Sequence, residues 1–123
     1  MLVEIRWYDK TYHTVLCRIE GKWSYSGYNH VYRQLMQYAR HVSEKINLIC
    51  DMTKTEWLVE DARLLQVSPF IHHAVIITDN INHPAAKQIE IVLHAQNPAV
   101  LVSHAPNVNA AMTQIRRVAS VGI

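Results

Sequence analysis

The chain has 123 residues, of which half are hydrophobic, and its formal net charge is +2 at pH 7. That length is typical of one domain, and so hydrophobic a chain can build a single core without disulfides or metal ions. The lysines and arginines do not gather in a run, which argues against a surface for nucleic acid or anionic membranes. We therefore predict one domain over residues 1–123, with no nucleic acid among its partners.

A charged residue occurs at every second or third position of the N-terminal segment, which therefore lacks the apolar core of a signal peptide. No apolar run reaches the length of a transmembrane helix. We expect a cytoplasmic protein without membrane insertion. Cys17 and Cys50 both fall in predicted strands, where a free thiol packs as a small hydrophobe. A bridge between them would require neighbouring strands, and free thiols are the more common arrangement.

The first predicted elements form a β-hairpin. Apolar and polar residues alternate through residues 2–8 and again through residues 13–20, which is the two-residue period of half-buried strands. The short polar segment Asp9-Lys10-Thr11 between the two runs suits a turn. Two such strands joined by a short link predict an antiparallel pair.

Helices and strands alternate after the hairpin. An amphipathic stripe runs from Tyr28 to Val42, with Ser24 or Ser26 as its cap. Pro84 suits the first turn of a second helix, which we expect to extend to about residue 96. The remaining predicted elements are a strand at 46–50, a loop entering a short helix within 54–67, strands at 72–78 and 99–103, and a last helix opened by Asn107 or Asn109.

This order of elements predicts an α/β fold with a mixed, mostly parallel five-stranded sheet. Residues 46–50, 74–77 and 99–102 are apolar at nearly every position, as in strands that are covered on both faces. If the helices cover only one face, a second subunit, a terminal segment or a partner protein must cover the other. Alternatively, one helix folds over to the second face and the chain is a monomer. We expect association, with a homodimer as the simplest case.

Element order and short motifs resemble the STAS domain, the fold of bacterial anti-sigma-factor antagonists. The motifs are Trp7-Tyr8-Asp9, then Glu20-Gly21-Lys22-Trp23 before the long helix, and Asp51-Met52-Thr53 after the apolar strand. The resemblance spans essentially the whole chain and extends to small stand-alone bacterial proteins of this fold. It implies strands in sequential order and helices stacked mainly on one face, as turns of a βα superhelix.

In the antagonists, an Asp-Ser-Ser/Thr-Gly segment opens the next helix, and its first Ser accepts a phosphate. This chain has Val59-Glu60-Asp61-Ala62 there, so Glu60 stands at the acceptor position. A serine kinase cannot phosphorylate a carboxylate, whose single charge copies only part of a phosphate. Thr53 and Thr55 are the nearest hydroxyls, and nothing marks either as an acceptor. The resemblance therefore implies an interaction or regulatory module without the phospho-switch.

Polar residues follow three of the predicted strands, at the sheet edge where ligands of α/β proteins commonly bind. Strand ends and helix caps use Asp, Asn, Ser and Thr in any protein, however. The chain has no catalytic motif and no Gly-rich phosphate loop, so we predict no catalytic residue. The candidate binding residues on this edge and in the loop after the central strand are Asp51, Thr53, Glu60, Asp61, Thr78, Asp79, Ser103 and His104.

No metal site or cofactor is predicted, because the eight histidines and two cysteines form no His-x-x-x-His or Cys-x-x-Cys pair. Two other functions compete with the interaction module. The three tryptophans and six tyrosines could line an apolar pocket for a small ligand or a lipid. A hydrolase or transferase would need Asp51 or His104 within hydrogen-bond reach of Thr53 or Ser103.

Overall fold

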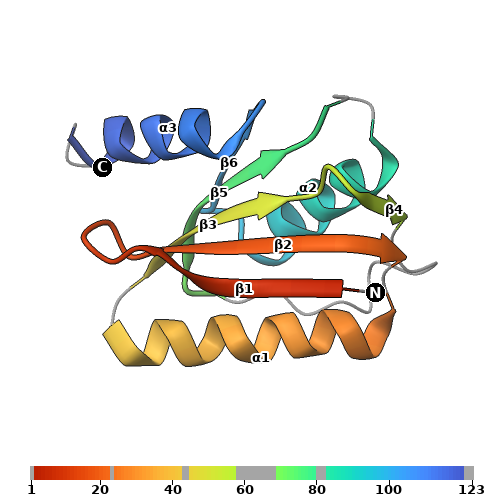
Figure 1. Ribbon diagram of the computed structural model, residues 1–123. Helices are drawn as coiled ribbons and strands as arrows, with labels where there is room; N and C mark the ends of the chain where they lie inside the picture. Colours follow the sequence, from red (N-terminus) through yellow and green to blue (C-terminus); the bar gives the residue numbers. More distant parts are fainter. Residues whose placement is uncertain (1, 23, 43–44, 58–68, 80–82, 121–123) are drawn as a thin grey trace.

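The computed structural model describes residues 2–22, 24–42, 45–57, 69–79 and 83–120. They form a mixed sheet with helices on both of its faces (Figure 1). The elements in chain order are β1 (Leu2–Asp9), β2 (Thr14–Lys22), α1 (Tyr25–Val42), β3 (Ile46–Asp51), β4 (Thr55–Trp57), β5 (Ile71–Ile77), α2 (Pro84–Gln96), β6 (Leu101–Ala105) and α3 (Val108–Ser120).

The sheet confirms the predicted α/β class. β1 pairs antiparallel with β2, and β2, β3, β5 and β6 then follow side by side as parallel strands. The predicted turn after β1 is confirmed as well, because the amide of Tyr12 donates to the Asp9 carboxylate at 3.3 Å. His13 completes the turn with φ at 47°, a left-handed conformation that few non-glycine residues adopt.

β4 is a sixth, short strand, and the predicted loop is wrong for these three residues. It pairs with the end of β2, where the Gly21 amide donates to the Lys54 carbonyl at 2.9 Å. The buried Thr55 hydroxyl donates to the Ile19 carbonyl at 3.0 Å. The sequence around residues 55–57 carries no signal for this pairing, because the residues with which they pair lie in β2, far away along the chain. The short helix predicted beyond it falls on residues 58–68, outside the described residues.

Side-chain caps decide where two helices begin. Ser24 caps α1, because its hydroxyl accepts a hydrogen bond from the Gly27 amide at 3.1 Å. Asn107 caps α3, because its side-chain oxygen accepts from the Ala110 amide at 2.9 Å. β6 begins two residues later than predicted, since Asn97 and Val100 form a turn with an amide-to-carbonyl distance of 3.1 Å.

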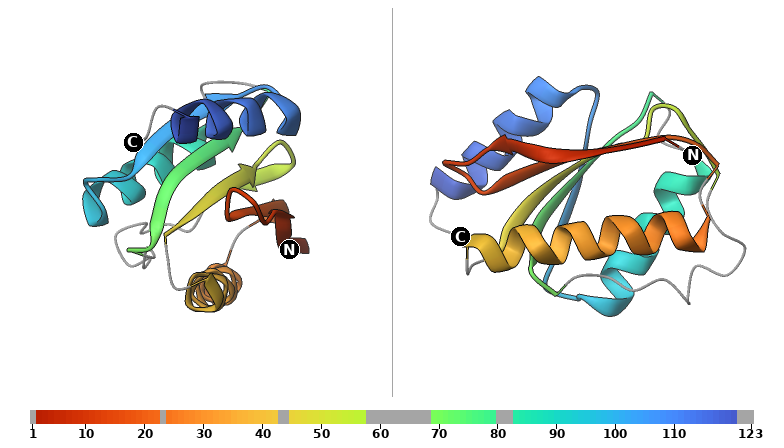
Figure 2. Two further views of the ribbon diagram at one scale, coloured as in Figure 1. Left: turned by 90° about the vertical axis from the view of Figure 1, so that its left-hand side faces the viewer. Right: turned by 60° about the horizontal axis from the view of Figure 1, so that its bottom comes forward.

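Alternating residues of the strands build two apolar cores. Residues of β2 show the pattern: Val15 and Cys17 face α1 and α2, whereas Leu16 faces the opposite side with α3. Figure 2 shows α1 and α3 on opposite sides of the sheet. In β5, Ile76 belongs to the first core and Val75 to the second. The apolar strands are therefore covered on both faces within one chain.

The bare apolar face that we considered as an association surface is not present over β3 and β5. The alternative arrangement is the one observed: the helix α3 folds over to this face, with Ala111, Met112 and Ile115 buried against the strands. Toward β1, the same face carries Glu4 and Arg18, which are partly exposed and charged. No helix in the described part of the chain is long and apolar enough to cross a membrane.

Candidate functional site

Asp51, the last residue of β3, forms an ion pair across the sheet. Its register partner on β2 is Arg18, whose Nε lies 3.0 Å from Asp51 Oδ2. Arg18 Nη1 also reaches Glu4 Oε2 on β1 at 3.1 Å, and Glu4 Oε1 pairs with Arg6 Nε at 2.7 Å. Charged side chains therefore connect β1, β2 and β3 on the face that α3 leaves open.

Asp51 also orders the backbone turn that follows β3. Its Oδ1 accepts hydrogen bonds from the Thr53 amide at 3.1 Å and from the Thr53 hydroxyl at 2.6 Å. Burial alone would raise the pKa of Asp51, but the hydrogen bonds from Thr53 and Arg18 outweigh it and lower that pKa. The hydrogen bond to Asp51 raises the pKa of Arg18 in turn. Both partners are therefore charged at neutral pH.

A surface hollow of about 300 Å³ surrounds this ion pair at the carboxyl ends of β2 and β3. Lys54 Nζ lies 3.6 Å from Glu20 Oε1 at its border, and the Lys54 side chain is 75% exposed. The hollow thus contains fixed charges of both signs. Its lining residues, which we call the Asp51 rim, are Arg18, Glu20, Asp51, Thr53 and Lys54.

The predicted site residues outside the Asp51 rim that the structure describes make no hydrogen bond or ion pair with Asp51. Thr78 and Asp79 follow β5, and Thr78 comes directly after Ile77, the register partner of Asp51 on that strand. Glu60 and Asp61 lie outside the described residues. Of the predicted edge residues that the structure describes, Asp51 and Thr53 are joined by hydrogen bonds, and Thr78 lies one residue beyond the register partner of Asp51.

Ser103 and His104 point to opposite faces of β6. The Ser103 hydroxyl donates to Gln114 Oε1 of α3 at 2.6 Å, and His73 Nε2 of β5 lies 2.8 Å from the same hydroxyl. His104 Nε2 instead lies 3.1 Å from the Glu90 carboxylate of α2. The histidine that contacts Ser103 is thus His73, which we did not predict as a site residue, and not His104. The two-residue period places His73 on the α3 face and is the signal that could have indicated it.

The Ser103 cluster, which consists of His73, Ser103 and Gln114, fastens α3 to the sheet. Because the Ser103 proton goes to Gln114, the Nε2 of His73 must carry a proton and donate to Ser103. Burial, and then the neighbouring His72, lower the pKa of His73 and favour the neutral ring. No described group hydrogen-bonds to the buried Nδ1 of His73. In this arrangement His73 cannot accept the serine proton, so the cluster is not a nucleophile with its base.

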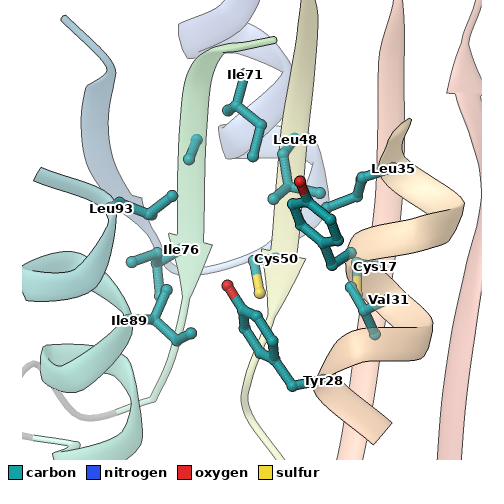
Figure 3. Close-up of a pocket in the computed structure, with 12 residues that line it drawn as sticks. Cys17, Tyr28, Val31, Leu35, Leu48, Cys50, Ile71, Ile76, Ile89 and Leu93 are labelled. Carbon is teal, nitrogen blue, oxygen red and sulfur yellow. The ribbon is translucent and has the colours of Figure 1, made fainter. Parts of the chain in front are cut away.

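An apolar cavity of about 40 Å³ lies between α1, α2 and the sheet (Figure 3). Cys17 and Cys50 line it from the strands, and Tyr28 lines it from α1. Trp7 is not among its described lining residues and instead packs edge-to-face on Tyr38, with ring centroids 5.0 Å apart. Pockets for drug-sized ligands occupy about 300–1,000 Å³, so this cavity has room for a much smaller molecule.

Among the described residues, no group of three or more His, Cys, Asp or Glu side chains is arranged to hold a metal ion. No protein-family model matches the chain, and no curated protein is similar to it in sequence. The resemblance to the STAS domain therefore stays a prediction. The features that bear on function are the Asp51 rim, the Ser103 cluster and the apolar cavity.

Proposed function

We propose that the protein is a non-catalytic, STAS-like interaction module that associates with a second copy of itself through the Asp51 rim. The observation that carries this proposal is the Arg18–Asp51 ion pair, held at 3.0 Å inside an open hollow. Hydrogen bonds from Thr53 fix the carboxylate further. Recognition groups that are ordered before binding lose little conformational entropy when a partner arrives.

The charges of the Asp51 rim suit a symmetric pair of chains. A two-fold interface places the same patch on both subunits, so a patch with both signs of charge can complement itself. Lys54 is the best-placed candidate for such a contact, because its side chain is 75% exposed and its pairing with Glu20 is long at 3.6 Å. In a dimer, Lys54 would reach a carboxylate of the second chain. Charge complementarity of this kind contributes specificity and association rate.

The distance condition that we set for an enzyme is met in one place. The Thr53 hydroxyl lies 2.6 Å from Asp51. However, the same carboxylate accepts from Arg18 and from the Thr53 amide, and its lowered pKa makes it a weak base. The other hydroxyl, Ser103, donates its proton to Gln114. These contacts favour the non-catalytic module over a hydrolase or transferase.

The alternative function, binding of a small ligand or lipid, would use the apolar cavity. A cavity of about 40 Å³ is smaller than the roughly 150 Å³ that accommodates benzene in an engineered protein core. A lipid chain would require the surrounding helices to separate. The cavity volume therefore favours the interaction module.

Sedimentation velocity over a wide concentration range tests the proposal. We expect the wild-type chain to dimerise reversibly, more tightly at low salt than at high salt because screening weakens charge contacts. Lys54→Glu should weaken dimerisation by about ten-fold or more, corresponding to the loss of one interfacial charge pair. Lys87→Glu makes the same charge change on the exposed side of α2 and should leave dimerisation unchanged.

Two results would contradict the proposal. A wild-type chain that stays monomeric at the highest concentration would exclude self-association. Equal weakening by Lys54→Glu and Lys87→Glu would show a response to net charge, and so would exclude a specific contact at the Asp51 rim.

A further inference from the structure

Cys17 and Cys50 lie directly opposite each other on neighbouring strands. They are register partners in the parallel pair of β2 and β3. Both are free thiols that belong to the core under α1 and α2, and both line the apolar cavity (Figure 3). Cys17 is 1% exposed and Cys50 is 5% exposed. The two thiols therefore share one face, one cavity and one register position.

This placement matches the geometry that a disulfide requires. Neighbouring strands lie about 4.8 Å apart, and disulfides join residues whose Cα atoms are about 4.4–6.8 Å apart. Register partners on the same face also direct their Cβ atoms to the same side of the sheet. Disulfides also require Cβ atoms about 3.5–4.5 Å apart, so a bond between the sulfurs of Cys17 and Cys50 needs side-chain rotation and a small approach of the two strands.

We propose that Cys17 and Cys50 form a reversible redox pair, which closes to an intramolecular disulfide when the folded protein meets hydrogen peroxide. The cavity beside both sulfurs measures about 40 Å³, whereas one water molecule needs roughly 10–15 Å³ in the same measure. A molecule as small as peroxide fits there, and a bulky disulfide reagent does not. The redox pair does not depend on self-association through the Asp51 rim.

The reaction has two steps. The sulfur of Cys50, the slightly less buried residue, attacks one peroxide oxygen; the O–O bond breaks, and the departing hydroxide takes the thiol proton to form water. Cys17 then attacks the Cys50 sulfur of the resulting sulfenic acid, and the S–O bond breaks. The second hydroxide leaves with the Cys17 proton as water. Two thiols are oxidised by two electrons, and one peroxide is reduced to two waters.

The reduced form is stable until an oxidant arrives. The hydrogen bond to Cys50, and then burial, raise the pKa of Cys17 well above its ordinary value. Because the thiolate is the reactive form, the raised pKa slows the reaction with every oxidant, hydrogen peroxide included, and burial limits it further to molecules small enough to enter the cavity. The cysteines precede Arg18 and Asp51 by one residue in both strands, on the opposite face. A disulfide here would link the two strands directly behind the ion pair.

Oxidation of the full folded chain with hydrogen peroxide tests this inference. After treatment, catalase removes the peroxide, and the chain is unfolded without reductant and alkylated with iodoacetamide. We expect wild-type chains to lose both alkylation sites, to remain single chains on a denaturing gel, and to yield one linked peptide containing Cys17 and Cys50. Dithiothreitol should restore both sites by thiol–disulfide exchange.

Cys17→Ala and Cys50→Ala are the matched controls, because each leaves one thiol without a partner. In Cys17→Ala, the remaining Cys50 should stop at the sulfenic acid, which dimedone labels. In Cys50→Ala, the remaining Cys17 should stay alkylatable. Three results would overturn the proposal: both wild-type thiols stay alkylatable while circular dichroism shows a folded chain, the link joins two chains, or the link forms only in urea-unfolded chain. The wild-type measurement decides the question even if a variant does not fold.

Discussion

Arg18 and Asp51 are register partners on β2 and β3, and 3.0 Å separates Arg18 Nε from Asp51 Oδ2. The pair joins the second strand of the N-terminal hairpin to its parallel neighbour β3. Only 15% of the Asp51 side chain is exposed, whereas 37% of the Arg18 side chain is exposed. The ion pair is therefore partly shielded from water, and we expect it to contribute more to stability than a fully exposed pair would.

Replacing Asp51 by Asn should lower the free energy of unfolding by about 1–2 kcal/mol at pH 7, since it removes charge-assisted hydrogen bonds. The pKa of Asp51 is lower in the folded chain than in the unfolded chain. Its stabilising contribution is thus complete above the unfolded-state pKa of about 3.9 and is lost as the pH falls through the folded-state pKa. Urea unfolding at a series of pH values measures this difference.

Asp79→Asn is the control for that experiment, because Asp79 is an exposed carboxylate after β5. We expect it to change stability by less than about 0.5 kcal/mol. A deficit of Asp51→Asn that does not shrink as the pH is lowered until Asp51 is protonated in the folded chain would show that the carboxylate charge is not its cause.

Replacing Ser103 by Ala should destabilise the chain by about 1–3 kcal/mol. The substitution removes the hydroxyl between Gln114 Oε1 and the buried His73 Nε2, and both atoms lose a hydrogen-bond partner. Ser120→Ala, at the exposed end of α3, removes a hydroxyl that donates to the Arg117 carbonyl and should have little effect. Similar unfolding midpoints for the two variants would contradict a structural role of the Ser103 cluster.

Replacing Asn107 by Ala should cost about 1 kcal/mol, because the Ala110 amide loses its capping oxygen at the start of α3. Asn109→Ala lies inside the first turn on an exposed position and should be neutral or slightly stabilising, since Ala favours helices. Thermal unfolding of the two variants gives the comparison. Equal losses at both positions would mean that the cap is not where α3 begins.

Replacing Ala74 by Val should stabilise the chain by about 0.5–1 kcal/mol. Ala74 is fully buried in β5 and lines the apolar cavity, so the added methyl groups enter empty space. Ala111→Val adds the same atoms to a fully buried position of α3 that is not among the described lining residues. Overpacking there should cost about 1–3 kcal/mol. A destabilised Ala74→Val chain would indicate that the cavity is already filled.

Local sequence patterns were sufficient to predict most of the helices and strands. The hairpin, α1, α2 and α3 follow from two-residue and four-residue periods together with Pro84 and the capping residues. The sequence left the cap of α3 open between Asn107 and Asn109, because both can accept a backbone hydrogen bond. The choice depends on which oxygen meets the Ala110 amide, and that requires coordinates.

Contacts between residues that are far apart along the chain could not be predicted from such local patterns. β4 exists because Gly21 and Ile19 offer backbone groups to Lys54 and Thr55. His73 meets Ser103 because β5 and β6 are neighbours in a particular register. Hydrophobic periodicity indicates which face of a strand is buried, but it does not say which polar side chain on the next strand will lie opposite.

By itself, the sequence determined that this chain is α/β, that its central strands are buried on both faces, and that Asp51 stands at a strand end. Those properties depend on residues that are close along the chain, so they can be predicted from the spacing of apolar and polar residues. Tertiary structure alone decided that α3 covers the second face, that Arg18 holds Asp51, and that Cys17 lies opposite Cys50. Each of these depends on strand order and register, which the packing of the whole domain selects.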